Sequence, residues 1–297
     1  MPDVPIIDAH VHLWDPAELW MPWLESSPLN KQFWLKEYSG ATEASQIEGI
    51  VYLEVDVAPA YALIEARQII DIADVDSRVM GIIPFAPLEA GDHLAPYLHE
   101  LRLLEIKDLE DSDWKSNWIK GVRRITQAEA DPKFCLQPGF VRGAQMLGSF
   151  GLTCDLCCNY TQLEYTVELV RQCPETAFIM DHIAKPNIRN GQLDPWRSQM
   201  ADLASLPNCW CKISGVVTEA NHDSWTTEDV KPFVLHALEV FGEDRVVFGG
   251  DWPVVLGASS WQRWVDALDE LTADLSDAAK RKLWNENARA FYRLSAA

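Results

Sequence analysis

The chain has 297 residues, 48% of them apolar, and a formal net charge of −20. This length suits one large α/β domain, and the acidic charge disfavours a nucleic-acid partner, because phosphates would be repelled over most of the surface. No run approaches the roughly 18 consecutive apolar residues of a membrane helix, and the start "MPDVPIIDAH" lacks a basic region, so we expect a cytoplasmic protein without a membrane partner.

Eight short apolar runs, rich in β-branched residues, are the expected strands. They cover residues 4–12, 49–55, 78–86, 119–126, 152–158, 177–183, 209–214 and 245–251. Amphipathic segments with apolar residues every three to four positions lie between them. This alternation is typical of parallel βα units, and eight such units close most economically into a barrel. We therefore predict an α/β fold in which the whole chain, residues 1–297, forms a single (β/α)8 TIM barrel.

Two connections between the expected strands are longer than usual. Residues 13–48 contain four tryptophans, and we expect this loop to lie over the active-site face as a lid or pocket wall. Residues 105–118 are acidic and are expected to form a solvated loop. Flat indole rings stack well on sugar rings, so Trp14 and Trp252 are candidates for substrate binding.

The first expected strand ends in two histidines one residue apart, within "IIDAHVHLWDP" at 6–16. Side chains at positions i and i+2 of a strand share a face, so His10 and His12 are expected to point together into the barrel, with Asp8 beside them. Two imidazoles are costly to bury without a function. We favour a catalytic or metal-ligating role over the alternative of structural histidines.

Two further candidates stand at strand ends, where the catalytic side chains of such barrels gather. Asp251 in "VVFGGDWP" follows the eighth run, and His182 in "FIMDHIAKP" follows the sixth. A carboxylate that caps the next helix is the alternative for Asp251. Asp181 precedes His182 and is expected on the opposite face of the strand.

Three charged residues are candidates for substrate binding. Arg123 and Arg124 are adjacent on a strand, so one faces the barrel, and we take Arg123 as the residue that grips a substrate oxygen. Lys212 could enter the barrel or extend to solvent at the strand end. Glu54 ends the second run and is a candidate for hydroxyl binding or an extra metal bond, with a structural pair to an arginine as the equal alternative.

Six segments resemble, in order and spacing, the sugar-lactonase branch of the amidohydrolase superfamily. They are "IIDAHVHLWDP", "KGVRRITQ", "FIMDHIAKP", "CKISGVVTEA", "FGEDRVVFGGDWPV" and "NENARAFYRL". This branch includes L-rhamnono-γ-lactonase and L-fuconolactonase and is related to 2-pyrone-4,6-dicarboxylate lactonase. The resemblance spans residues 4–294 and implies an amidohydrolase-type barrel that hydrolyses a cyclic ester. Ala184 stands where the family often has glycine, and Gly250 where it often has serine.

The resemblance and the residue types imply the same chemistry. A lactone carbonyl needs a deprotonated water on one side and stabilisation of its developing oxyanion on the other. Asp251 is expected to be the general base, while His10, His12 and His182 polarise the carbonyl, directly or through one zinc ion. His10, His12 and Asp251 form the expected metal site. Members of the branch differ in metal use, so catalysis without a metal stays open.

The expected substrate is a neutral aldonolactone, because the chain is strongly acidic and a dicarboxylate would require several arginines in the pocket. L-rhamnono- or L-fucono-lactone, from deoxy-sugar breakdown, is the favoured example. Two other functions stay open: a metal-dependent decarboxylase of an aromatic or unsaturated acid on the same barrel, and a sugar-binding barrel without enzymatic activity. A homodimer also stays open.

Overall fold

The computed structural model describes residues 2–106 and 117–295. Within these ranges the chain forms eight strands: β1 (Ile6–Val11), β2 (Ile47–Leu53), β3 (Val79–Ile83), β4 (Gly121–Ile125), β5 (Thr153–Cys157), β6 (Phe178–Met180), β7 (Cys209–Ile213) and β8 (Val246–Phe248). All neighbouring strands pair in parallel, in the order β1-β2-β3 and β4-β5-β6-β7-β8. Sheet order therefore follows chain order, as repeated right-handed βα units require.

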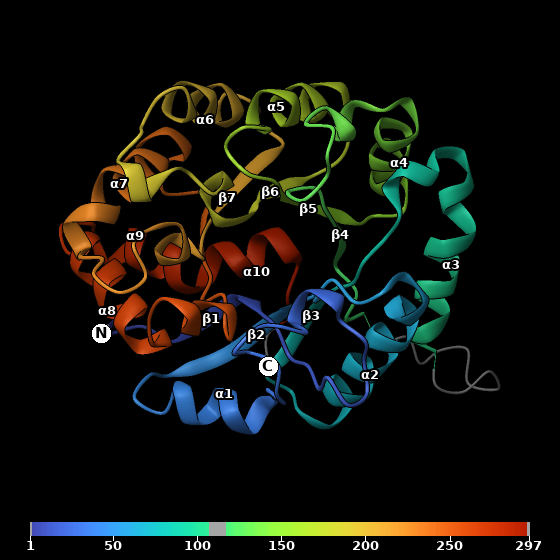
Figure 1. Ribbon diagram of the computed structural model, residues 1–297, viewed down its shortest axis with the longest axis horizontal. Coiled ribbons are helices and arrows are strands. Elements are labelled where there is room, and N and C mark those ends of the chain that lie inside the picture. Colours follow the sequence, from blue (N-terminus) through green and yellow to red (C-terminus); the bar gives the residue numbers. More distant parts are fainter. Residues whose placement is uncertain (1, 107–116, 296–297) are drawn as a thin grey trace.

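Backbone hydrogen bonds at two seams join these ladders into a barrel. Between β3 and the start of β4, the Ile82 N–H donates to the Trp118 carbonyl at 2.8 Å. Between β1 and the segment after β8, the His12 N–H donates to the Trp252 carbonyl at 2.8 Å. The predicted (β/α)8 TIM barrel is confirmed, and Figure 1 shows its strands surrounded by helices.

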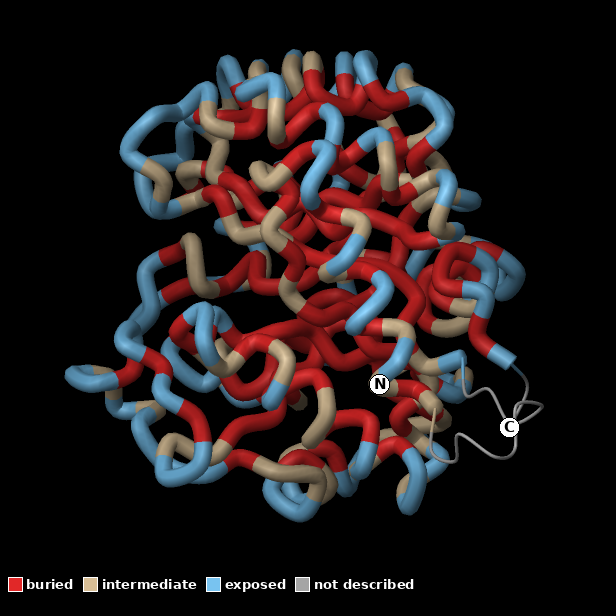
Figure 2. The backbone as a smooth tube through the Cα atoms, turned by 90° about the vertical axis from the view of Figure 1, so that its right-hand side faces the viewer, coloured by how far each residue is buried: buried red, intermediate tan, exposed pale blue. Residues whose placement is uncertain are grey.

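The outer layer consists of helices whose apolar faces pack on the strands. The helices of this layer are α1 (Leu35–Ala41), α2 (Ala62–Val75), α3 (Leu94–Leu104), α4 (Pro138–Ser149), α5 (Leu163–Gln172), α6 (Trp196–Ala204), α7 (Thr227–Phe241), α8 (Trp261–Leu271) and α9 (Asp277–Arg281), and a tenth helix, α10 (Asn287–Tyr292), follows them. In α8, Trp261, Trp264 and Leu268 are spaced three and four residues apart and are all buried. Figure 2 shows the buried segments running through the middle of the molecule, with exposed segments around them.

Helix α10 closes one end of the barrel. Figure 1 places it inside the ring of helices, and its Phe291 and Tyr292 are buried in one apolar cluster with Ile7 of β1 and Val51 of β2. The Arg293 guanidinium donates to the carbonyl of Lys120, which precedes β4. Because α10 lies against the amino ends of the strands, a ligand reaches the interior from their carboxyl ends.

The predicted acidic loop at 105–118 lies mostly outside the described residues. At its described start, Glu105 is buried and accepts a 3.0 Å hydrogen bond from the Ile119 N–H. No helix in the described ranges is long and apolar enough to cross a bilayer.

Candidate active site

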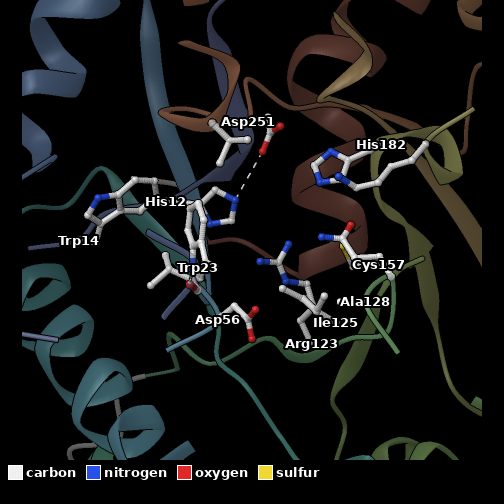
Figure 3. A pocket seen from close by; sticks show the side chains of 14 residues that line it. His12, Trp14, Trp23, Asp56, Arg123, Ile125, Ala128, Cys157, His182 and Asp251 are labelled. Carbon is white, nitrogen blue, oxygen red and sulfur yellow. Dashed lines mark hydrogen bonds and ion pairs between the residues drawn. The ribbon is translucent and has the colours of Figure 1, made fainter. Parts of the chain in front are cut away.

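A cavity of about 260 Å³ lies at the carboxyl ends of the strands. Five of the predicted residues line it, and besides Trp14 these are His12 after β1, Arg123 in β4, His182 after β6 and Asp251 after β8. Figure 3 shows these four side chains pointing toward one another. The wall also includes Trp23, Asp56, Gln127, Cys157 and Lys185.

A bulge in β1 brings both histidines of the HxH pair into the interior. The register with β2 shifts after Asp8, so side chains no longer alternate strictly between the two faces. His10 and His12 both contact groups inside the barrel, whereas Asp8 lies in the helix layer, where its carboxylate accepts from Tyr38 Oη at 3.0 Å and Trp261 Nε1 at 2.8 Å. The prediction that Asp8 shares their face is wrong, because parity holds only in a strand without a bulge.

Asp8 links the first strand to the segment that follows the eighth strand. Its Oδ1 accepts from the N–H of His10 at 3.2 Å and from the N–H of Gly250 at 2.7 Å. Burial raises the pKa of Asp8 to about 6, although these hydrogen bonds act in the opposite direction. A Cβ at Gly250 would lie 2.1 Å from Trp261 Nε1 and 2.3 Å from Asp8 Oδ2. The close approach of these two side chains therefore explains glycine, and not serine, before Asp251.

The Asp251 carboxylate faces the two histidines of β1. Its Oδ1 lies 3.5 Å from His12 Nε2 and 3.7 Å from His10 Nε2. His12 Nδ1 lies 2.9 Å from the Leu53 carbonyl, which can only accept, so this nitrogen carries a proton. In the neutral ring, Nε2 then presents its lone pair toward Asp251. Two acceptors at this separation are stabilised by a shared cation, or by a water that donates one hydrogen to each of them.

A left-handed turn follows β6 and carries His182. The four residues His182–Lys185 have φ angles of 55°, 47°, 61° and 46°. Residues other than glycine pay about 1–2 kcal/mol each for this conformation, and such strain concentrates at functional sites. The turn brings both of its end residues to the cavity.

His182 is a neutral imidazole held by a hydroxyl. Its Nδ1 lies 2.9 Å from Ser214 Oγ. Burial, together with the nearby charge of Lys185, holds the pKa of His182 well below the usual range. A ring that accepts the Ser214 hydroxyl proton at Nδ1 carries its own proton on Nε2, where it can donate to a ligand.

A chain of buried ion pairs crosses the barrel beneath the cavity. Arg123 Nε lies 2.8 Å from Glu54 Oε1, and Arg123 Nη1 lies 3.2 Å from Asp181 Oδ2. Lys212 Nζ lies 2.9 Å from Asp181 Oδ1 and 2.6 Å from Asp155 Oδ2. Glu54 and Lys212 are buried and do not reach the cavity wall. Both are enclosed in these ion pairs, and Glu54 forms the structural pair to an arginine that was the equal alternative to hydroxyl binding.

The ion-pair chain also orients His10. Its Nδ1 lies 3.4 Å from Asp181 Oδ1, and its Nε2 lies 3.3 Å from Arg123 Nη1. Burial, followed by the charge of Lys212, holds the pKa of His10 well below its usual range, so the ring is neutral. Asp181 was expected to face away from His182, but both side chains enter the interior, because the left-handed turn ends the strand alternation at this point.

The aromatic candidates divide between the cavity and the core. Trp14 lines the cavity, and its Nε1 donates to the Lys31 carbonyl at 3.0 Å. Trp252 is 1% exposed and packs edge-on against Phe33 and Tyr38 in the helix layer, so its predicted contact with substrate is wrong. The chain turns at Asp251, whose φ is 54°. Because of this turn the Asp251 side chain faces the cavity, whereas the side chain of the next residue, Trp252, faces the helix layer.

The buried donor set of His10, His12 and Asp251 fits a divalent metal such as zinc. A tetrahedral ion with bonds of about 2.0–2.2 Å separates its ligand atoms by about 3.4 Å, close to the separations of 3.5 and 3.7 Å between the carboxylate and the two rings. The outer nitrogen of the His12 ring faces the Leu53 carbonyl oxygen, as in most metal-ligating histidines, whereas His10 Nδ1 lies 3.3 Å from the Lys212 ammonium.

A family model described as Amidohydrolase matches residues 7–294. The chain belongs to the amidohydrolase family. The L-fucono-1,5-lactonase of Burkholderia ambifaria is 26% identical over 297 residues, which cover 97% of this chain and 95% of that protein. The L-rhamnono-gamma-lactonase of Scheffersomyces stipitis is 23% identical, with 97% and 98% covered. A crystallised Burkholderia multivorans amidohydrolase with bound zinc has a TM-score of 0.84 at 25% identity and covers 98% of this chain and 100% of its own.

This amidohydrolase also places residues in its cavity wall that the sequence did not single out as site residues, among them Trp23 and Lys185. Trp23, from the long loop, donates from Nε1 to the Val55 carbonyl at 2.8 Å. Lys185 stands three residues after His182. Its short sequence distance from the end of β6 is the sequence feature that could have indicated a place in the cavity wall. Neither could be assigned from strand parity, because both lie in connections.

Proposed function

We propose that this amidohydrolase opens a sugar-derived lactone, an aldonolactone such as L-rhamnono- or L-fucono-lactone, to the open-chain aldonic acid. The observation that carries the proposal is the Asp251 carboxylate, which faces the His10 and His12 imidazoles in a cavity that His182 also lines. Relatives named as lactonases match nearly the whole chain and support this substrate class. Deoxy-sugar breakdown is the setting that such a reaction fits.

Asp251 is the general base in this proposal. Its carboxylate takes a proton from a water molecule in the cavity, and the oxygen of that water attacks the lactone carbonyl carbon. A positioned base of this kind contributes about 10²- to 10⁴-fold to turnover. Asp251 is 2% exposed, so a bound substrate would exclude competing solvent from it.

His182 stabilises the oxyanion that develops on the carbonyl oxygen. Its Nε2–H donates to this oxygen while Ser214 holds the ring through Nδ1. A single oriented donor of this kind is worth about 3–4 kcal/mol in the transition state. A divalent metal bound by His10, His12 and Asp251 would supply Lewis-acid polarisation of the same carbonyl.

The cavity suits a neutral, hydroxylated ring. The charge of Arg123 is balanced by Glu54 and Asp181 at 2.8 and 3.2 Å, so little of it remains to attract a substrate carboxylate. Trp14 and Trp23 offer indole surface against a ring. Asp56 is a carboxylate acceptor for substrate hydroxyls.

A pH-indicator assay over a panel of aldonolactones tests the proposal. The protein is assayed as purified, after dialysis against a chelator, and after zinc is restored, with spontaneous lactone opening subtracted. Enzymatic acid release from at least one aldonolactone is the expected result. No release from any lactone, together with CO₂ release from an aromatic acid, would overturn the proposal in favour of a decarboxylase.

A further inference from the structure

Lys185 is a cation in the cavity wall that the reaction described above leaves without a role. It ends the left-handed turn that begins at His182, and its side chain is 18% exposed. Its ammonium lies 3.6 Å from Glu219 Oε1, which is longer than a hydrogen bond. Within residues 2–106 and 117–295, its Nζ donates no hydrogen bond, and Glu219 is the carboxylate with which it pairs. Its N–H donors are therefore available to a ligand.

The other cations near the site have no such freedom. Arg123 donates to Glu54 and pairs with Asp181, and Lys212 lies completely buried between Asp155 and Asp181. A flexible, hydrated lysine is costly to hold in a strained turn at a cavity wall. That cost is understandable if the ammonium contacts the substrate.

Lactone opening requires a proton for the ring oxygen that departs, and an ammonium group can donate one. When the acyl carbon–oxygen bond breaks, its electron pair passes to the ring oxygen, which would leave as a strongly basic alkoxide. Asp251 already holds the proton from the attacking water. The departing oxygen needs a proton, which comes either from the protonated Asp251 or from a second acid at the cavity wall.

We propose that Lys185 is a catalytic residue that donates this proton, an inference that rests on the lactonase function proposed above. The water oxygen bonds to the carbonyl carbon, the bond from that carbon to the ring oxygen breaks, and the ring oxygen takes a proton from Lys185 Nζ. The proton on Asp251 leaves to solvent, and Lys185 regains one from solvent beside Glu219, which is 27% exposed. The net change is one water added and one hydroxy acid formed.

The test compares two leaving groups. An aldonolactone releases an alkoxide, whereas the matching thiolactone, with sulfur in the ring, releases a thiolate that needs no proton because thiol pKa values are near 8.5. Lys185→Met should lower kcat by about 10²- to 10⁴-fold on the lactone and by less than about tenfold on the thiolactone. Lys231→Met removes a 44% exposed lysine from α7 and should change neither rate.

A second variant keeps the positive charge if Lys185→Met does not fold. Lys185→Arg retains a cation that does not give up a proton near neutral pH, so it should lose lactone turnover and keep thiolactone turnover. Equal losses on both substrates, or no loss on the lactone, would overturn the role of Lys185 while the lactonase function stands. A wild-type protein that opens no lactone would overturn the proposed function and this inference with it.

Discussion

The backbone N–H of Gly250 donates a 2.7 Å hydrogen bond to the carboxylate of Asp8, so the first strand fixes the residue that precedes Asp251, the proposed general base. The same carboxylate accepts from the N–H of His10. One buried group outside the cavity thus holds Asp251 and the HxH pair in relation to each other. Positioning by a rigid neighbouring group is what keeps a catalytic constellation within the small tolerance that turnover requires.

Replacing Gly250 with alanine should destabilise the protein. The new Cβ would lie 2.1 Å from Trp261 Nε1, and overpacking of this kind costs about 1–3 kcal/mol. Gly257→Ala is the matched control, because its Cβ would meet no heavy atom within 4 Å. Urea unfolding of both variants measures the difference. A Gly250→Ala variant as stable as Gly257→Ala would show that the contact yields without cost.

The stability of the protein should fall as pH rises because of Glu65. Burial and the charge of Glu54 raise the pKa of Glu65 from 4.5 to about 8 in the folded state. Between these values the folded state binds more protons than the unfolded state, so this group lowers the free energy of unfolding by up to about 1.4 kcal/mol per pH unit. Its contribution is present below pH 4.5 and is lost as pH rises through 8.

Glu65→Gln provides the measurement. Glu65 Oε1 accepts from Tyr52 Oη at 2.6 Å and from the Val55 N–H at 2.8 Å, and a glutamine carbonyl can accept both. Urea unfolding at pH 5 and pH 7.5 should show a smaller pH difference in the variant than in the wild type. The same difference in both proteins would rule out Glu65 as its source.

Loss of His12 should weaken zinc binding. His12 Nε2 lies 3.5 Å from Asp251 Oδ1, and removal of one ligand leaves an incomplete donor set. Competition with a chromophoric chelator should show affinity lowered at least about 10- to 100-fold in His12→Ala. His222→Ala, at an exposed histidine, is the control and should bind zinc like the wild type. Equal zinc binding by His12→Ala and the wild type would remove His12 from the metal site.

The barrel could be predicted because strands buried on both faces read as continuous apolar runs. His10, His12, His182 and Asp251 could be found for a related reason, since polar residues at the ends of such runs are unusual. Asp8 was misplaced because a bulge in β1 leaves no sequence signal that parity can detect. Local periodicity describes regular strands and stops where the backbone leaves them.

The cavity wall was harder to predict than the catalytic centre. Lys185 reaches it through consecutive left-handed residues that no propensity favours, and Trp252 leaves it because the chain turns at Asp251. Lys212 lies on a strand of the barrel, as a substrate-binding lysine would, but Asp155 and Asp181 enclose its ammonium. These outcomes depend on long-range packing between strands far apart in the sequence.

The most direct test compares aldonolactone turnover by the wild type and by Asp251→Asn, after subtraction of spontaneous opening. Asparagine keeps the shape of the side chain and removes the base, so the variant should turn over about 10²- to 10⁴-fold more slowly at unchanged stability. Hydrolysis by Asp251→Asn at the wild-type rate would contradict the account.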